Sequence, residues 1–353
     1  MSTMVQAIRM ALHVGESRLG VTDIFGQDVG PPLGGVFTQT QGLTKTWNTP
    51  LDERGIIGAA MGLALAGQRP VCEIQFCDYA FNCIDLLKLA GGLCWSSNGD
   101  FNLPIVMMTP VGSGIHGSLY HSHAFDGQAT RTPGWKIVLP STPRDAYGLL
   151  LSAIVDPNPV MFLPPKALLR QKSLPGEEIP GEPADERQLS KMIDAPVGDR
   201  SGWRPDWPST ADLFIPIGEG KLVRRGRDVT VVTYGRMVQL CVKAAEALAG
   251  EGVEVEVIDL RSLHPYDFAM IEASVRRTNR LLVVNEDTEV TNFGEHLIRR
   301  VVEEMFYELY APPRLLAGKN LPAVGLADTL EKASVPQLPA IVTALREMAR
   351  HQP

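Results

Sequence analysis

The stretch VTVVTYGRMVQLCVKAAEALAGEGVEVEVIDL, residues 229–260, decides the fold class. Two near-continuous apolar runs, 229–235 and 253–260, are typical of strands that are buried on both faces, and the segment between them has the spacing of a helix. A third apolar run, 280–286, follows another helical segment. Strand, helix and strand in this order predict a parallel sheet covered by helices on both faces.

The same alternation fills the first half of the chain. We expect strands there at 21–25, 71–75, 105–109, 136–139 and 160–163, and helices at 55–66, 79–94 and 143–155. In the second half, helices are expected at 238–249, 267–276 and 294–309. The amino terminus is predicted to form an amphipathic helix with Arg9, His13 and Glu16 on its polar side. The fold class is therefore α/β, with two doubly wound parallel-sheet domains.

The length favours two domains, because 353 residues exceed what one ordinary core needs. The predicted domains span residues 1–170 and 214–353. Between them, residues 171–213 are rich in Pro, Gly, Asp and Glu and show little periodicity, which is typical of a linker or an insertion. Two interpretations of this segment stay open: an arm on a partner's surface, or a partly disordered connection.

The composition excludes several classes of protein. A formal net charge of -7 without a long basic cluster disfavours nucleic acid as a partner. We expect a soluble cytoplasmic protein with no membrane association, because no apolar stretch reaches about 18 residues and no signal-peptide pattern is present. The five cysteines form no Cys-x-x-Cys pair, so buried reduced thiols are favoured over zinc.

The most informative motif is NTPLDERGIIGAAMGLALAG, residues 48–67. Thr49, Pro50 and Asp52 are residues that begin helices, which places Glu53 in a first helical turn. The run of small residues after Gly55 lets this helix approach another closely, and we expect it to be buried. Local physics alone explains Glu53 as a carboxylate that complements the helix dipole.

Two further motifs carry aromatic and histidine side chains. EIQFCDYAFNCIDLL, residues 73–87, places Tyr79 just beyond a strand's carboxyl end, where α/β sheets bind ligands. An amphipathic core tyrosine is the alternative. GSGIHGSLYHSHAFDG, residues 112–127, is a glycine-rich loop with His116, His121 and His123. A metal site there is disfavoured, because no Cys or acidic ligand accompanies the His-x-His pair.

Together and in this order, these motifs resemble the β subunit of the thiamin-diphosphate-dependent decarboxylating component of 2-oxo acid dehydrogenases, the branched-chain type above all. The resemblance covers nearly the whole chain outside 171–213. It implies a transketolase-like pyrimidine-binding domain followed by a domain similar to the carboxyl-terminal domain of transketolase.

The resemblance also assigns site residues. Glu53 would bond a ring nitrogen of the cofactor's aminopyrimidine and relay the proton that activates thiamin. Leu51, Gln75 and Tyr79 would hold the pyrimidine, with Tyr79 stacked on its ring. His121 would serve the 2-oxo acid substrate and the transfer of the acyl group.

A partner chain is implied by what the sequence lacks. It contains no Gly-Asp-Gly string for a diphosphate-bound metal and no Walker loop. The resemblance therefore implies an α subunit that supplies the Mg²⁺ ligands in an α2β2 heterotetramer. It implies docking onto a lipoyl-bearing acyltransferase core as well. It also implies a K⁺ site, for which the matching positions are Leu103, Ile105, Val106, Ala153, Asp156 and Asn158.

The implied reaction is oxidative decarboxylation of a 2-oxo acid with reductive acylation of a lipoyl group. The Glu-Ile-Gln-Phe string favours a branched-chain acid, with pyruvate and acetoin as alternatives. From other classes, a non-catalytic nucleotide-binding module or a scaffold subunit is the alternative, although a phosphate-binding glycine loop is missing. The chain departs from the family pattern at Gln27, Arg54, Pro164 and Asn285, and these departures leave the substrate preference open.

Overall fold

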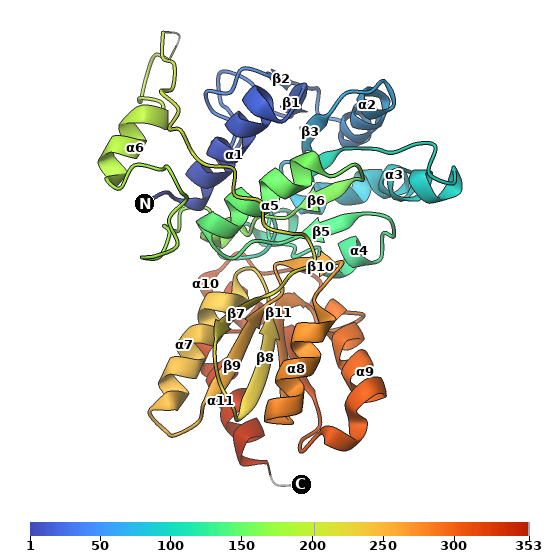
Figure 1. The fold of residues 1–353 in the computed structure, drawn as a ribbon, viewed down its shortest axis with the longest axis vertical. Helices are drawn as coiled ribbons and strands as arrows, with labels where there is room; N and C mark the ends of the chain where they lie inside the picture. The colour runs from blue at the N-terminus through green and yellow to red at the C-terminus, as the bar shows by residue number, and fades with distance from the viewer. Residues whose placement is uncertain (201, 352–353) are drawn as a thin grey trace. The chain divides into compact units, whose positions relative to one another are not determined.

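The computed structural model describes residues 1–200 and 202–351, and its contacts divide the chain into two compact units. Unit 1 comprises Met1–Pro110 and Thr132–Ile217, and unit 2 comprises Val111–Arg131 and Gly218–Pro353. The histidine loop therefore belongs to unit 2, while the segment 171–217 belongs to unit 1. Each unit is built around its own mainly parallel sheet (Figure 1).

The sheet of unit 1 contains β1 (Asp23–Gly26), β2 (Thr46–Asn48), β3 (Pro70–Glu73), β4 (Val106–Met108), β5 (Lys136–Val138) and β6 (Val160–Phe162). These strands lie in the order β5-β6-β4-β3-β1-β2 and all their pairings are parallel. The helices of unit 1 are α1 (Met4–Arg18), α2 (Glu53–Leu65), α3 (Ile84–Ser96), α5 (Pro143–Val155) and α6 (Glu186–Ile193), with 3-10 turns at Cys77–Cys83 and Lys166–Leu168.

Unit 2 has a five-stranded sheet in the order β12-β11-β8-β9-β7. Its strands are β7 (Lys221–Arg224), β8 (Val229–Thr233), β9 (Val255–Asp259), β11 (Leu281–Thr288) and β12 (Arg314–Gly318), and only the edge strand β7 is antiparallel to its neighbour. The helices are α4 (Asp126–Thr130), α7 (Met237–Ala249), α8 (Phe268–Thr278), α9 (Phe293–Met305), α10 (Asp328–Ser334) and α11 (Leu338–Arg350); 3-10 turns cover Ser118–Tyr120 and Phe306–Glu308, and a short strand β10 covers Ser262–His264. Figure 1 shows α7 and α11 on one side of this sheet and α8 and α9 on the other.

The predicted α/β class with parallel sheets and helices on both faces is confirmed. Alternate residues of a strand face the same side of the sheet. Val229, Val231 and Val255 pack in one cluster with α7 and α11. Helix α5 begins where the sequence predicts, because Thr142 accepts a hydrogen bond from the Asp145 amide and Pro143 occupies the first turn. Among the described residues, no helix is long and apolar enough to cross a membrane.

Two expectations about helices are wrong. Arg9 does not lie on a polar, solvated side of α1, because its side chain is only 1% exposed and pairs with Asp194 of the segment after α6. Helix α2 is not buried all round, because Gly58 and Gly62 face open space. A distant part of the chain covers α1 at Arg9, whereas no residue that the structure describes covers α2 at Gly58 and Gly62.

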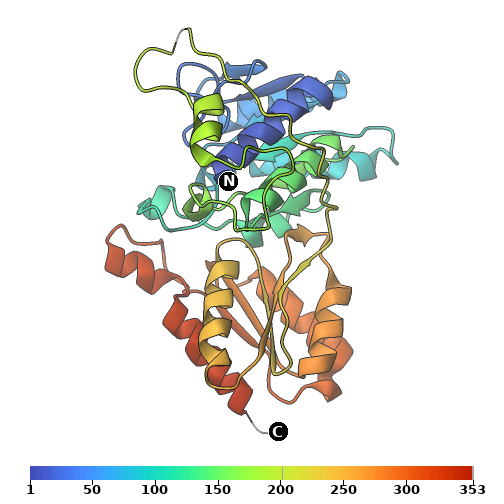
Figure 2. The same cartoon turned by 60° about the vertical axis from the view of Figure 1, so that its left-hand side comes forward.

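The segment 171–217 packs on unit 1 instead of trailing as a loose connection. Figures 1 and 2 show α6 beside the amino-terminal half of α1. Leu189 and Ile193 of α6 are fully buried in the core of unit 1, together with residues of α1 and α5. Helix α6 is therefore part of the core of unit 1.

Candidate functional site

Glu53 is the first residue of α2 and lies at the carboxyl-terminal edge of the sheet in unit 1. Its Oε1 accepts a hydrogen bond of 3.3 Å from Nε2 of Gln27, and Gln27 follows directly on the end of β1. Parallel strands that end side by side gather their following residues at one edge, where α/β sheets bind ligands. The Glu53 carboxylate is therefore held at the position where such a site is expected.

Gln75 extends the same cluster from the next strand. Its Nε2 donates to the Gln27 carbonyl and to Oδ2 of Asp28, each at 3.2 Å. Gln75 lies two residues beyond β3, which pairs directly with β1. The Gln75 side chain thus holds the backbone of Gln27, whose own side chain contacts Glu53.

Tyr79 lies in the 3-10 turn Cys77–Cys83 that follows β3. Its ring meets that of Phe76 edge to face, with centroids 5.8 Å apart. Burial raises the pKa of Tyr79, and the negative charges of Asp78 and Glu53 raise it further. Glu53 also contributes, after burial, to the raised pKa of Cys83, about 12. The Glu53 carboxylate thus faces the turn that carries Tyr79.

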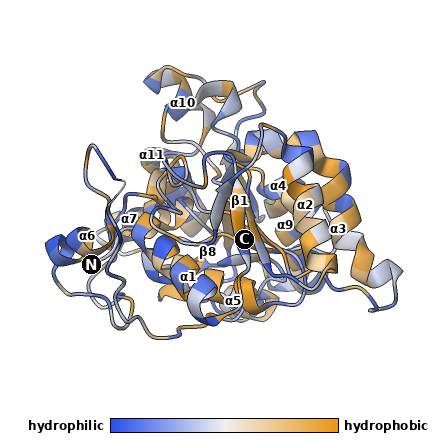
Figure 3. Ribbon diagram, turned by 90° about the horizontal axis from the view of Figure 1, so that it is seen from above, coloured by the Kyte–Doolittle hydropathy of each residue, from blue (hydrophilic) through white to orange (hydrophobic). Residues whose placement is uncertain are grey.

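The remaining predicted pyrimidine residue, Leu51, is 81% exposed. It borders a wider apolar surface on α2 and α3, in which large side chains are turned to solvent. Figure 3 shows these two helices side by side with apolar residues on their outer sides. We define this α2–α3 face by Leu51, Gly58, Gly62, Leu65, Phe81, Leu89, Gly92 and Trp95. Apolar patches of this kind mark interaction surfaces.

The histidine loop lies in unit 2 and is described apart from the residues of unit 1. His121 follows the turn Ser118–Tyr120, and its Nδ1 is 3.3 Å from the Gly117 carbonyl oxygen. Such a bond needs the proton on Nδ1, which leaves Nε2 as an acceptor. The other two histidines have different surroundings: His116 pairs with Glu331 at 2.7 Å, and the ring of His123 meets Phe125.

The loop is anchored by carboxylates that the sequence did not single out. The Glu331 carboxylate accepts from the Gly114 and His116 amides. Asp287 accepts from the Gly127 amide at 2.7 Å, and Tyr234 donates to Asp126. Burial raises the pKa of Asp126 well above its usual range, and the neighbouring Asp287 raises it further. Within the sequence of the loop, only the acidic residue Asp126 indicates this cluster of carboxylates.

A second buried carboxyl, Glu73, ends β3. Its side chain is 3% exposed, and burial raises its pKa to about 8. One of its carboxyl oxygens, Oε2, has no hydrogen-bond partner among the residues that the structure describes. Glu73 belongs to the Glu-Ile-Gln-Phe motif, but the sequence predicted functions only for its neighbours Gln75 and Tyr79.

Two positively charged side chains already contact the loop that is predicted to bind a cation. Lys136 bonds the Asp156 carboxylate, and Arg69 donates to the Ile154 and Asp156 carbonyls. Asp156 also accepts from the Asn158 amide at 2.9 Å. With two cationic side chains on these oxygens, this part of the loop is a poor fit for a further cation.

Other metal chemistry finds no support in the parts of the chain that the structure describes. Within residues 1–200 and 202–351, no group of three or more His, Cys, Asp or Glu side chains is arranged to hold a metal ion. Cys72, Cys77, Cys83 and Cys241 are buried free thiols and Cys94 is partly buried, as the sequence predicts.

Comparisons with known families match both units. Residues 2–172 match the family described as "Transketolase, pyrimidine binding domain", and residues 218–341 match "Transketolase, C-terminal domain". The segment between these matches, residues 173–217, contains α6.

Curated relatives match over nearly the full length. The chain is 34% identical to the 2-oxoisovalerate dehydrogenase subunit beta of Bacillus subtilis (strain 168), with 98% of each chain covered. It is 38% identical to the protein of the same name from Pseudomonas aeruginosa, with 91% and 88% covered. The pyruvate dehydrogenase E1 component subunit beta of Acholeplasma laidlawii is 35% identical, with 99% of each chain covered.

A solved structure shares the fold at low sequence identity. It is described as "Split gene transketolase, inactive beta4 tetramer", and it superimposes with a TM-score of 0.69 at 16% identity, covering 99% of this chain and 98% of the other. This likeness supports the transketolase-like architecture of both units.

Proposed function

Because the chain belongs to the family of β subunits of 2-oxo acid dehydrogenases, we propose that it contributes the pyrimidine half of a thiamin diphosphate site in which a 2-oxo acid is decarboxylated. The observation that carries this proposal is the place of Glu53, held by Gln27 at the sheet edge and facing the turn of Tyr79. A carboxyl group and an aromatic ring are the two groups that an aminopyrimidine needs, one to bond a ring nitrogen and one to stack.

When bound, thiamin diphosphate supplies the carbanion that attacks the 2-oxo group and accepts the electrons left by departing CO₂. The chain's own residues supply positions and protons. Glu53 holds a proton between its carboxyl oxygen and the ring nitrogen, and Tyr79 and Leu51 cover the pyrimidine. In unit 2, Nε2 of His121 is the acceptor that serves the substrate and the acyl group, because Nδ1 is engaged with Gly117.

The diphosphate half of the site is proposed to come from an α subunit, which would also hold Mg²⁺ with oxygen ligands. The sequence has no string suited to that task, and the α2–α3 face offers a surface for a second chain. The open glycines Gly58, Gly62 and Gly92 let a partner's backbone approach closely. An α2β2 assembly fits a chain whose relatives are named as beta subunits.

The substrate is proposed to be a branched-chain 2-oxo acid, as the names of the Bacillus and Pseudomonas relatives say of those proteins. Pyruvate is the second candidate, favoured by the relatives named pyruvate dehydrogenase E1 component subunit beta. The acyl group would pass to a lipoyl group on an acyltransferase core. A cytoplasmic location goes with the free, reduced cysteines.

The monovalent cation stays a prediction. The carbonyls of Leu103 and Ile105 each accept one backbone hydrogen bond and keep a second lone pair. Lys136 and Arg69 nevertheless bring two positive charges to Asp156 and its neighbours. No step of the proposed reaction depends on a cation at this loop.

The proposal is tested with the purified chain, alone and assembled with an α subunit of the same family. Calorimetry with thiamin diphosphate and Mg²⁺ should show tight binding only for the assembled pair. A panel of branched 2-oxo acids and pyruvate should then show decarboxylation by the pair. Tight cofactor binding by this chain alone, or no decarboxylation of any acid by the pair, would contradict the shared site.

A further inference from the structure

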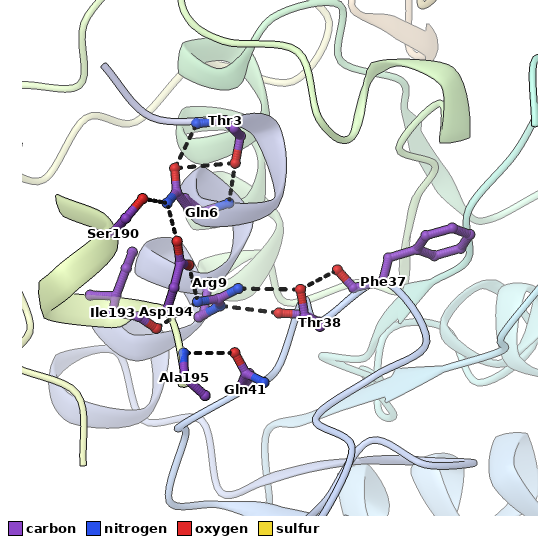
Figure 4. Close-up of polar contacts among 10 residues, drawn as sticks. All are labelled: Thr3, Gln6, Arg9, Phe37, Thr38, Gln41, Ser190, Ile193, Asp194 and Ala195. Atoms are coloured by element: carbon purple, nitrogen blue, oxygen red, sulfur yellow. Dashed lines mark hydrogen bonds and ion pairs between the residues drawn. The ribbon is translucent and has the colours of Figure 1, made fainter. Parts of the chain in front are cut away.

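The segment between the two family matches contacts the proposed cofactor site through a chain of side chains within unit 1. Its part that matters here is α6 with the two residues after it, residues 186–195, which we name the brace. The brace lies against α1, where Gln6 Nε2 donates to Asp194 Oδ2 at 2.9 Å and to Ser190 Oγ at 3.3 Å (Figure 4). The brace is thus fixed to α1 by side-chain hydrogen bonds.

Arg9 of α1 joins the brace to a second segment. The guanidinium donates to the Ile193 carbonyl at 2.6 Å and to Asp194 Oδ1 at 2.9 Å, and on its other side to the Thr38 carbonyl at 3.1 Å. Burial lowers the pKa of Arg9, and the Asp194 carboxylate counteracts that effect. Since a buried cation is costly without partners, Arg9 depends on both segments for its charge.

The segment on the other side of Arg9 is residues 27–42, which we name the pocket loop. Thr38 has a backbone φ of 63°, a left-handed conformation that is rare for a β-branched residue. Its carbonyl and hydroxyl both face Arg9, and the Ala195 amide of the brace donates to Gln41 Oε1 at 3.2 Å. Contacts from the brace and Arg9 therefore hold the pocket loop in a conformation that the sequence alone disfavours.

The pocket loop contacts the candidate site at two places, through Phe37 and through Gln27. Figure 4 shows the Phe37 ring pointing away from Arg9. This ring meets Phe76 edge to face at 5.8 Å, and Phe76 meets Tyr79 in the same way. At the start of the loop, the Gln27 side chain donates a hydrogen bond to Glu53.

We propose that the brace, acting through Arg9 and Thr38, positions the pocket loop and thereby holds Tyr79 and Glu53 ready for the cofactor's pyrimidine. Arg9, Thr38 and Asp194 are positioning residues in this account and touch neither cofactor nor substrate. The inference rests on the proposed function of Glu53 and Tyr79. It gives the segment between the two family matches a role in cofactor affinity.

The test replaces Asp194 with alanine in the assembled complex and uses Asp212→Ala as a matched control. Asp212 pairs with Arg18 at 3.0 Å, so it also joins α1 to the same segment, and its side chain is 44% exposed against 39% for Asp194. Hydrogen exchange of residues 27–42 and the dissociation constant of thiamin diphosphate with Mg²⁺ are measured. Asp194→Ala should raise both about tenfold, because a buried charge loses its partner, and should leave kcat at saturating cofactor within about twofold. Asp212→Ala should change neither.

Thr38→Gly is the second variant. Glycine accepts the left-handed conformation, so the chain should still fold, but it lacks the hydroxyl that faces Arg9 and restricts the backbone less at this position. It should loosen the pocket loop and weaken cofactor binding even if Asp194→Ala fails to fold. The proposed role of the brace would be overturned by unchanged hydrogen exchange and unchanged cofactor affinity in these variants. A lower melting temperature without weaker cofactor binding would overturn it as well. A wild-type complex that binds no thiamin diphosphate would instead contradict the proposed function.

Discussion

The Gln27 carboxamide donates a hydrogen bond to the Glu53 carboxylate across 3.3 Å, and the Gln75 side chain donates to the backbone carbonyl of the same Gln27. A neutral donor stabilises the charged form of a carboxyl group. Gln27 is therefore placed to orient the Glu53 carboxylate at this edge of the sheet.

Replacing this donor with an acid should weaken catalysis. In Gln27→Glu, a second carboxyl group faces the Glu53 carboxylate in place of the donor, and two carboxylates at this distance repel each other. The kcat/KM of the complex at neutral pH should therefore fall about tenfold or more. The control Gln27→Met removes the donor without adding a charge and should lower kcat/KM by less. An unchanged kcat/KM in Gln27→Glu would contradict the place of Gln27 beside a catalytic Glu53.

Glu73→Gln should stabilise the protein at alkaline pH. The folded-state pKa of Glu73, about 8, lies above the ordinary value of 4.5, so the unfolded chain loses its proton first as the pH rises. The contribution of Glu73 to stability is complete below pH 4.5 and is lost as the pH rises toward 8. The variant should unfold with a free energy higher by about 2 to 4 kcal/mol at pH 8, and with little change at pH 5. Thermal unfolding of the assembled protein at both pH values measures this difference.

Glu16→Gln serves as a control of opposite sign. Burial alone would raise the pKa of Glu16, but hydrogen bonds from His13 and from the Lys45 and Thr44 amides lower it below its ordinary value. Its stabilisation is present above pH 4.5 and is lost as the pH falls through the lowered folded-state pKa. Glu16→Gln should therefore lower the melting temperature at neutral pH. If both variants shift stability in the same direction at pH 8, the assignment of a neutral Glu73 is wrong.

The α2–α3 face should tolerate larger side chains only in the unassembled chain. Among the described residues, nothing lies within 4 Å of a Cβ atom added at Gly58 or Gly62. Glutamine favours a helix interior over glycine by about 0.5 to 1 kcal/mol. Gly62→Gln should raise the melting temperature of the chain alone and weaken its assembly with the α subunit at least about tenfold. Ala273→Gln, on an exposed side of α8 among charged residues, should leave assembly unchanged. Sedimentation of the two-chain mixture reads the outcome, and unimpaired assembly of Gly62→Gln would move the interface elsewhere.

His121 should affect acyl transfer more than His123, which shares its loop. His121→Asn should lower the rate of lipoyl acylation by about 100-fold, as expected for loss of a proton-transferring group. His123→Asn, whose ring packs on Phe125, should lower it less than about fivefold. Decarboxylation read with an artificial electron acceptor separates this step from the earlier ones. Equal losses in both variants would contradict the assignment to His121.

Local sequence signals located most elements of the fold. Residues 143–155 were predicted as a helix to the residue, since Thr142 and Pro143 define its start. The eight predicted strands lie within two residues of their observed ends, because buried parallel strands are short apolar runs. Four strands of the described residues were not predicted: Thr46–Asn48, Lys221–Arg224, Ser262–His264 and Arg314–Gly318. Where two structures share the same pattern, the prediction was wrong: the helix expected from Tyr79 begins as a 3-10 turn and becomes α3 only at Ile84.

Features that depend on distant residues were not predictable. The burial of Arg9 follows from Asp194, 185 residues along the chain, and nothing near Arg9 in sequence signals that partner. The carboxyl pair Asp126 and Asp287 joins residues 161 positions apart, so only the fold brings them together. For the candidate site, sequence and resemblance predict Glu53, Tyr79 and His121 as functional residues, which stays a prediction, whereas the Gln27 contact and the brace required coordinates.

The most direct test of the central claim is the rate of decarboxylation by the assembled complex with Glu53→Gln. The variant keeps the size of the side chain and a hydrogen-bonding group near Gln27, but it cannot relay a proton. With the complex intact and saturated with thiamin diphosphate, the rate should fall about 100-fold or more. A rate within about threefold of the wild type would contradict the role of Glu53 and, with it, the site proposed at this edge of the sheet.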